Sequence, residues 1–104
     1  MSADTMTAVA AIRLGLLALR EQALGDTADI EDQAAVLQAL HDDRHREDSV
    51  LGMVWDLLAD LGAAIGDQGA EEAAEAIDEA AGYVQDTGPR LERARAALTE
   101  ETGR

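Results

Sequence analysis

The sequence predicts an all-α protein, a four- to five-helix bundle whose helices are mostly antiparallel. Apolar residues recur at a three-four spacing along most of the 104 residues, and no useful stretch alternates apolar and polar residues as a half-buried strand does. β-Branched residues are scarce, and glycine or proline interrupts the pattern near residues 25, 62–69 and 87–89. We expect one helical domain over residues 1–104, with frayed termini at 1–4 and 100–104.

The first predicted helix covers residues 5–24, with Asp4 as its N-cap and Gly25 as a C-terminal residue of positive φ. It carries two apolar strips, and Arg13 and Arg20 lie between them. A helix that is apolar over so much of its circumference needs more than one neighbour, either in the bundle or in a second subunit. The candidate interface residues are Val9, Ile12, Leu16, Leu17, Leu19 and Leu24.

The second predicted helix begins near Asp29 and has an uncertain end. A repeat of seven residues from Ile30 to Ile65, without glycine or proline up to residue 51, is compatible with one long helix over 29–65. The stretch 42–48 has no apolar residue to bury, which favours a break or bend there. A third helix is then expected over 49–65, with the cleanest amphipathic face of the chain.

The fourth predicted helix covers residues 70–86 and presents a stripe of mostly small side chains. Thr87-Gly88-Pro89 should stop it, because proline lacks the backbone N–H and disfavours helix in the residue before it. A short fifth helix over 89–99 would have to dock to survive. The apolar stripes of the helices over 5–24, 49–65 and 70–86 are expected to form the core.

Charge and composition exclude several classes of function. The formal net charge is −14, and Trp55 and Tyr83 are the only aromatic residues. Nucleic-acid binding needs a basic face, and an anionic membrane surface would repel this chain. The chain has no cysteine, its first residues lack the basic start of a signal peptide, and its longest apolar run is too short to span a bilayer, so we expect a cytoplasmic protein without membrane contact.

Two histidines four residues apart form the first candidate site. On a continuous helix, His41 and His45 would share one face with Asp48, and two imidazoles and a carboxylate can bind a divalent metal. The alternative is a hydrogen-bonded polar layer or a solvated bend. A symmetric dimer could also bring four histidines together in a pH-sensitive interface.

Asp48-Ser49-Val50 forms the second candidate site. Together with Leu24-Gly25, the apolar face down to Leu61-Gly62 and the segment 76–84, it resembles the acyl carrier protein family in outline over residues 6–86. The resemblance implies a phosphopantetheine arm on Ser49. The chain departs from the family pattern, because Val50 replaces a leucine and no glycine stands just before Asp48. The alternative assigns Ser49 to an ordinary helix N-cap.

A third candidate is an acidic surface on the helix over 70–86, formed by Glu71, Glu75, Asp78 and Glu79. It could imitate DNA phosphates and bind a basic partner, as an acidic decoy or inhibitor. The alternative is a solvated helix face.

The chain has no glycine-rich phosphate loop and no Ser/His/Asp constellation in a recognisable context. The sequence therefore predicts a non-catalytic protein–protein interaction or assembly module that forms a homodimer. The expected partner is a second copy of the chain or another protein. The acidic surface would favour a partner that is basic.

Overall fold

The computed structural model describes the backbone of residues 1–102 and the side chains of residues 1–100. Within this part the chain is helical and has no strand, which confirms the all-α class. Part of the terminus predicted to fray, residues 103–104, lies outside the described residues. The elements are α1 (Ala3–Leu24), α2 (Ile30–Leu40), a 3₁₀ helix η1 (Arg46–Asp48), α3 (Val50–Asp67) and α4 (Glu71–Thr102).

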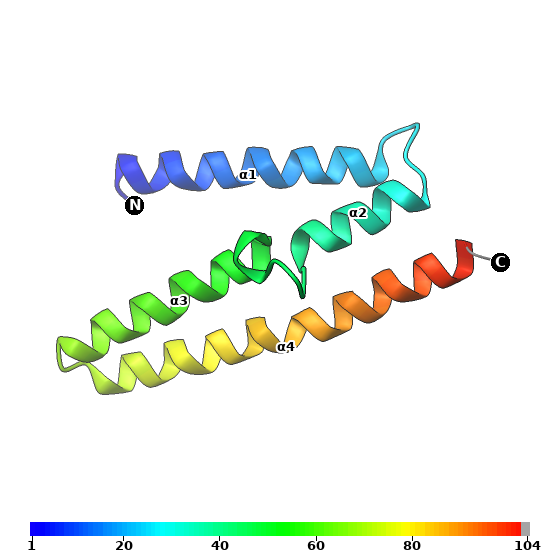
Figure 1. Cartoon of the computed structure of the whole chain (residues 1–104). Coiled ribbons are helices and arrows are strands. Elements are labelled where there is room, and N and C mark those ends of the chain that lie inside the picture. The colour runs from blue at the N-terminus through cyan, green and yellow to red at the C-terminus, as the bar shows by residue number, and fades with distance from the viewer. Residues whose placement is uncertain (103–104) are drawn as a thin grey trace.

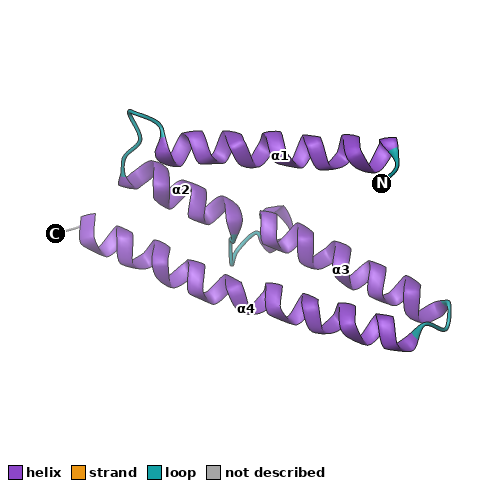
Figure 2. Ribbon diagram, turned by 180° about the vertical axis from the view of Figure 1, so that it is seen from behind, coloured by secondary structure: helices purple, strands orange, loops and turns teal. Residues whose placement is uncertain are grey.

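Helix α4 is the longest helix, and both α2 and α3 pack against it (Figure 1). Helix α3 packs along its N-terminal half and α2 along its C-terminal half, so that α2 and α3 follow each other end to end (Figure 2). Helix α1 folds back and packs against α2. The principal extents are 55 × 30 × 18 Å. The smallest extent equals only about two helix diameters, so the protein is a thin, flat assembly of helices.

Helix α1 begins and ends differently from the prediction. Ser2, rather than Asp4, is the N-cap, and its hydroxyl accepts a hydrogen bond of 3.2 Å from the Thr5 N–H. Gly25 caps the C-terminus with φ −63° instead of a positive φ. A side chain at position 25 would nevertheless collide with the helix, because a Cβ there would lie 2.6 Å from the Glu21 carbonyl oxygen. Position 25 is therefore a glycine because there is no room for a side chain, and not because of its backbone conformation.

The predicted break after α2 is confirmed. Helix α2 starts with a capping box in which the carboxylates of Asp29 and Asp32 each accept the other residue's backbone N–H, at 3.0 and 3.1 Å. It ends at Leu40, and residues 41–49 form a loop that contains η1. Ser49 then caps α3. The alternative of one continuous helix over 29–65 is wrong. The polar stretch 42–48 has nothing to bury, and it makes local side-chain hydrogen bonds instead.

Helices α3 and α4 approach closely where their side chains are small. A Cβ on Gly62 would lie 2.9 Å from Asp78 Oδ1, and a Cβ on Gly66 would lie 3.6 Å from Ala74 Cβ. These two glycines therefore belong to the helix interface. The expectation from the sequence that they help to end the third helix is wrong, because α3 continues to Asp67. The turn to α4 is made at Gly69, whose φ of +89° is a conformation that favours glycine.

The predicted stop at residues 87–89 is wrong, and the fourth and fifth predicted helices are one helix. Helix α4 continues through Pro89. A proline inside a helix costs about 3 kcal/mol, because one backbone hydrogen bond is lost. The packing of α2 against the C-terminal half of α4 compensates for this loss. Nearby carbonyls gain side-chain donors: Thr87 Oγ1 donates to Tyr83 O at 3.0 Å, and Arg90 Nη1 donates to Asp86 O at 2.7 Å.

The core is thin. Among residues 1–100, Ala81 is the only apolar side chain that is buried, with 6% of it exposed. Helix α1 has no buried residue, so the predicted core shared by the first helix with the two long helices is not formed within one chain. The radius of gyration is 16.6 Å, whereas a compact domain of this length has about 13 Å.

Candidate functional site

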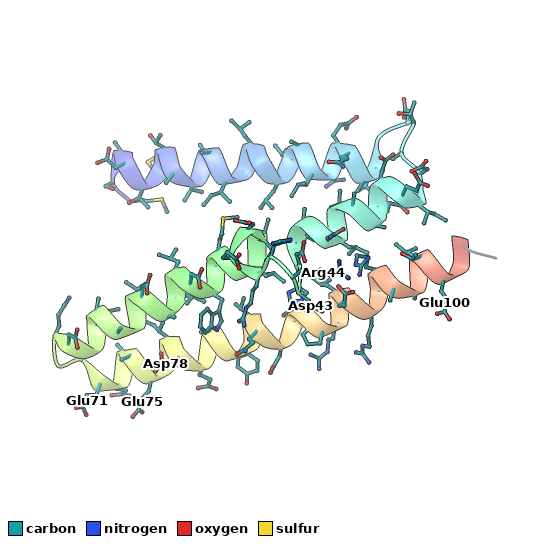
Figure 3. All side chains as sticks on the ribbon, viewed as in Figure 1. Asp43, Arg44, Glu71, Glu75, Asp78 and Glu100 are labelled. Carbon is teal, nitrogen blue, oxygen red and sulfur yellow. The ribbon has the colours of Figure 1, made fainter. Side chains whose placement is uncertain are left out.

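The loop between α2 and α3, residues 41–49, contains every polar residue that the sequence singled out for metal or cofactor binding. It lies at the gap between the two helices, against the middle of α4 (Figure 1). Asp43 and Arg44 lie in this gap in Figure 3. The loop is therefore the first candidate for a chemical site.

Asp42 organises the start of this loop. Its Oδ1 accepts hydrogen bonds from the backbone N–H groups of Arg44 (2.9 Å) and His45 (3.3 Å), and its Oδ2 accepts one from Gln38 Nε2 (3.2 Å). The backbone hydrogen bond from Arg44 is the main reason that the pKa of Asp42 lies below its ordinary value, because it stabilises the charged carboxylate. The charged form of Asp42 thus holds the turn that ends α2.

His41 points into the molecule and away from the predicted metal group. It is the C-cap of α2, and only 12% of its side chain is exposed. Its Nε2 lies 2.6 Å from Asp43 Oδ1, and its ring packs over Gly88 of α4. Because α2 ends before His41, the helical face expected to align it with His45 does not exist.

His45 and Asp48 are brought together, with a neighbour that sequence analysis missed. One ligand atom each of His45, Glu47 and Asp48 lie within 4.8 Å of one another, and all three residues are exposed. An imidazole and two carboxylates are a possible donor set for a divalent metal. The tight 3₁₀ turn η1 places His45 and Asp48, which are three residues apart, on one side, and Glu47 stands between them in the sequence. No feature of the sequence predicted that turn.

Ser49 is buried and its hydroxyl is engaged as a helix cap. Its exposed fraction is 2%. Its Oγ donates to the Arg46 carbonyl at 2.8 Å and accepts from the Gly52 N–H at 3.1 Å. The structure therefore shows the N-cap that the sequence offered as the alternative to a modified serine. A phosphopantetheine arm on Ser49 would replace the hydroxyl proton, so the hydrogen bond to the Arg46 carbonyl would be lost and the buried side chain would have to become accessible.

A small hollow lies beneath the loop, and its key contact was also missed from the sequence. The guanidinium of Arg46 stacks 4.7 Å from the centre of the Trp55 ring. The hollow has a volume of about 250 Å³, below the range of roughly 300–1,000 Å³ that is usual for small-molecule sites. It is lined by His41, Asp43, Arg46, Leu51, Gly52, Trp55, Val84, Gln85 and Pro89.

The apolar surface of α1 is the second candidate site. Apart from Leu19, which is partly covered, the predicted interface residues are all strongly exposed. The exposed fractions are 49% for Val9, 62% for Ile12, 45% for Leu16, 49% for Leu17 and 65% for Leu24. Contact with α2 is confined to the C-terminal end of α1, where Gln33 Nε2 donates to the Ala23 carbonyl at 3.2 Å. The structure thus leaves most of this apolar surface uncovered.

The acidic residues of α4 do not form one uniform face. Glu71, Glu75 and Glu79 are exposed, and Figure 3 shows Glu71 and Glu75 pointing away from the other helices. Asp78 instead lies against α3, beside Gly62. Residues 47–89 contain eleven acidic residues and no arginine, so α3 and the N-terminal half of α4 carry only negative charge.

Comparison with protein-family models, with curated proteins and with solved structures gives no match to this chain. Among the described residues, no helix is long and apolar enough to cross a membrane.

Proposed function

We propose that this protein is a non-catalytic assembly module that acts as a homodimer, and that α1 forms the main part of the dimer interface. The observation that carries the proposal is the exposed apolar surface of α1, a helix without a buried residue. Isolated helices are only marginally stable in water, and amphipathic packing usually stabilises them. The main packing of helix α1 is against α2.

The total accessible surface supports the same proposal. The chain exposes 7695 Å². A folded monomer of 11.0 kDa is expected to expose about 5,600 Å². The excess of roughly 2,000 Å² per chain exceeds the surface of about 800 Å² per partner that a standard interface buries, and it lies in the range of obligate dimers.

In a single chain, nothing accounts for so much exposed apolar surface. A monomer with Ala81 as its one buried apolar side chain among residues 1–100 has too small a core for a domain of this length. Pairing two chains through α1 would complete the helical bundle that the sequence predicts. Folding and dimerisation would then be coupled.

Sedimentation and light scattering test the proposal. We expect a mass of twice 11.0 kDa at tens of micromolar, and a melting temperature that rises with protein concentration. The double variant Ile12→Asp/Leu16→Asp should lose both properties, because it places two charges in the interface. Tyr83→Asp is the matched control, since Tyr83 is 67% exposed on α4. A folded monomer at these concentrations would overturn the proposal.

A further inference from the structure

Helix α3 has an apolar strip that no other helix covers. Met53, Val54, Leu57 and Leu61 are 52%, 40%, 65% and 44% exposed. They recur at helical spacing on a side of α3 different from the one that Gly62 and Gly66 present to α4. This strip is a second uncovered apolar surface, separate from that of α1.

Helix α1 extends well beyond the helix that it packs on. It has 22 residues and α2 has 11, so α2 can cover only about half of its length at 1.5 Å per residue. In Figure 1 the N-terminal half of α1 projects past the end of α2, on the side of the molecule where α3 lies. The N-terminal half of α1 and the outer strip of α3 thus both need a helical partner.

The charges beside these two strips are complementary. Arg13 and Arg20 are exposed, lie between the two apolar strips of α1, and have no ion pair with a carboxylate in the described part of the chain. On α3, Asp60 and Asp67 are exposed, lie beside the apolar strip, and have no arginine nearby in the sequence. Both pairs are separated by seven residues, which is about 10.5 Å along a helix.

We infer that, in the homodimer, α1 of each copy lies along α3 of the other copy, with Arg13 and Arg20 beside Asp60 and Asp67. The inference rests on the proposed dimer and names the surface that receives α1. The reciprocal contact would cover both apolar strips in both chains. It would also pair four arginines with four aspartates at the rim, which fixes the register of the helices.

Cross-linking of mixed chains tests which helices meet. The natural chain has no cysteine, so a Leu17→Cys chain and a Leu61→Cys chain with different tags can be unfolded, mixed and refolded together. A short bismaleimide should then join the two different chains in preference to two Leu17→Cys chains. Dominant cross-linking between two Leu17→Cys chains would place α1 against α1, and would overturn the inference while the dimer remains.

Charge reversal provides an independent test of the register. Arg13→Glu/Arg20→Glu should weaken dimerisation at least about tenfold, because all four rim ion pairs of the dimer become repulsive. Adding Asp60→Arg/Asp67→Arg to the same chain should restore affinity. The matched control adds Glu71→Arg/Glu75→Arg instead, which changes the net charge equally but lies on α4. Equal rescue by both additions would show a general charge effect and contradict the pairing, whereas a monomeric wild type would contradict the dimer itself.

Discussion

The imidazole of His41 occupies the space in which a side chain at Gly88 would lie. A Cβ on Gly88 would be 2.5 Å from His41 Cε1 and 2.6 Å from its Nδ1. Gly88 is buried in the middle of α4. The C-terminal end of α2 therefore packs on α4 through the ring of His41, which is the C-cap residue of α2, and through Gly88 of α4.

We expect Gly88→Ala to destabilise the protein by about 1–3 kcal/mol, because the added methyl group forces the His41 ring to move. Chemical denaturation measures this change. In a His41→Ala background the ring is absent, so the same substitution should lose most of its effect, as a double-mutant cycle would show.

Gly82→Ala is the matched control on the same helix. A Cβ at Gly82 would meet nothing within 4 Å. Replacement of a helical glycine by alanine at such a position should stabilise the protein by up to about 1 kcal/mol. Similar destabilisation by Gly82→Ala and Gly88→Ala would mean that the contact with His41 is not the cause.

Pro89 offers a test of the continuous helix α4. Pro89→Ala should stabilise the protein by about 1–3 kcal/mol, because the alanine N–H can donate to the carbonyl of Gln85 while the helix keeps its course. Denaturation by urea and the helical signal in circular dichroism would be measured together. A loss of stability would show that the proline is needed where the sequence had placed a helix end.

Asp42 should make stability depend on pH at the acid end. Because its pKa is lowered in the folded protein from an ordinary 3.8, its carboxylate contributes stability that is fully present above that value. The contribution is lost as the pH falls through the lower folded pKa. Thermal melting from pH 6 to pH 2 should therefore show wild type more stable than Asp42→Asn at the upper end, with the difference disappearing at the lower end.

Asp26→Asn is the control for this titration. Asp26 lies in the loop after α1, and its side chain makes no hydrogen bond that the structure records among the described residues. A constant difference between wild type and Asp42→Asn over the whole pH range would contradict the role given to the charged carboxylate. An equal pH-dependent difference for Asp26→Asn would show a nonspecific charge effect.

Local signals in the sequence predicted the helices and the break between α2 and α3. The spacing of apolar residues, the helix start near Asp29 and the polar run 42–48 are short-range features, and the structure follows them. Pro89 misled the prediction because its effect depends on packing: α2 supports α4 on the far side of the proline. Which helices share a core could not be predicted either, because helical spacing gives the apolar side of a helix and not its neighbour.

The candidate site was predicted only in part. Ser49 has the N-cap role that the sequence offered as one alternative. His45 and Asp48 lie close together, but His41 does not join them, since the end of α2 turns its ring toward α4. Glu47 and the Arg46–Trp55 stacking depend on the 3₁₀ turn, and no residue type marks such a turn in the sequence.

The α3–α4 hairpin has a consequence for the order of folding. Its two helices are neighbours in the sequence, and a turn of three residues around Gly69 joins them, so their contacts need little loop closure. In the proposed dimer, by contrast, the uncovered part of helix α1 gains its partner only when two chains meet. Refolding should therefore begin with a fast step within each chain, and should end with a slower step whose rate increases with protein concentration.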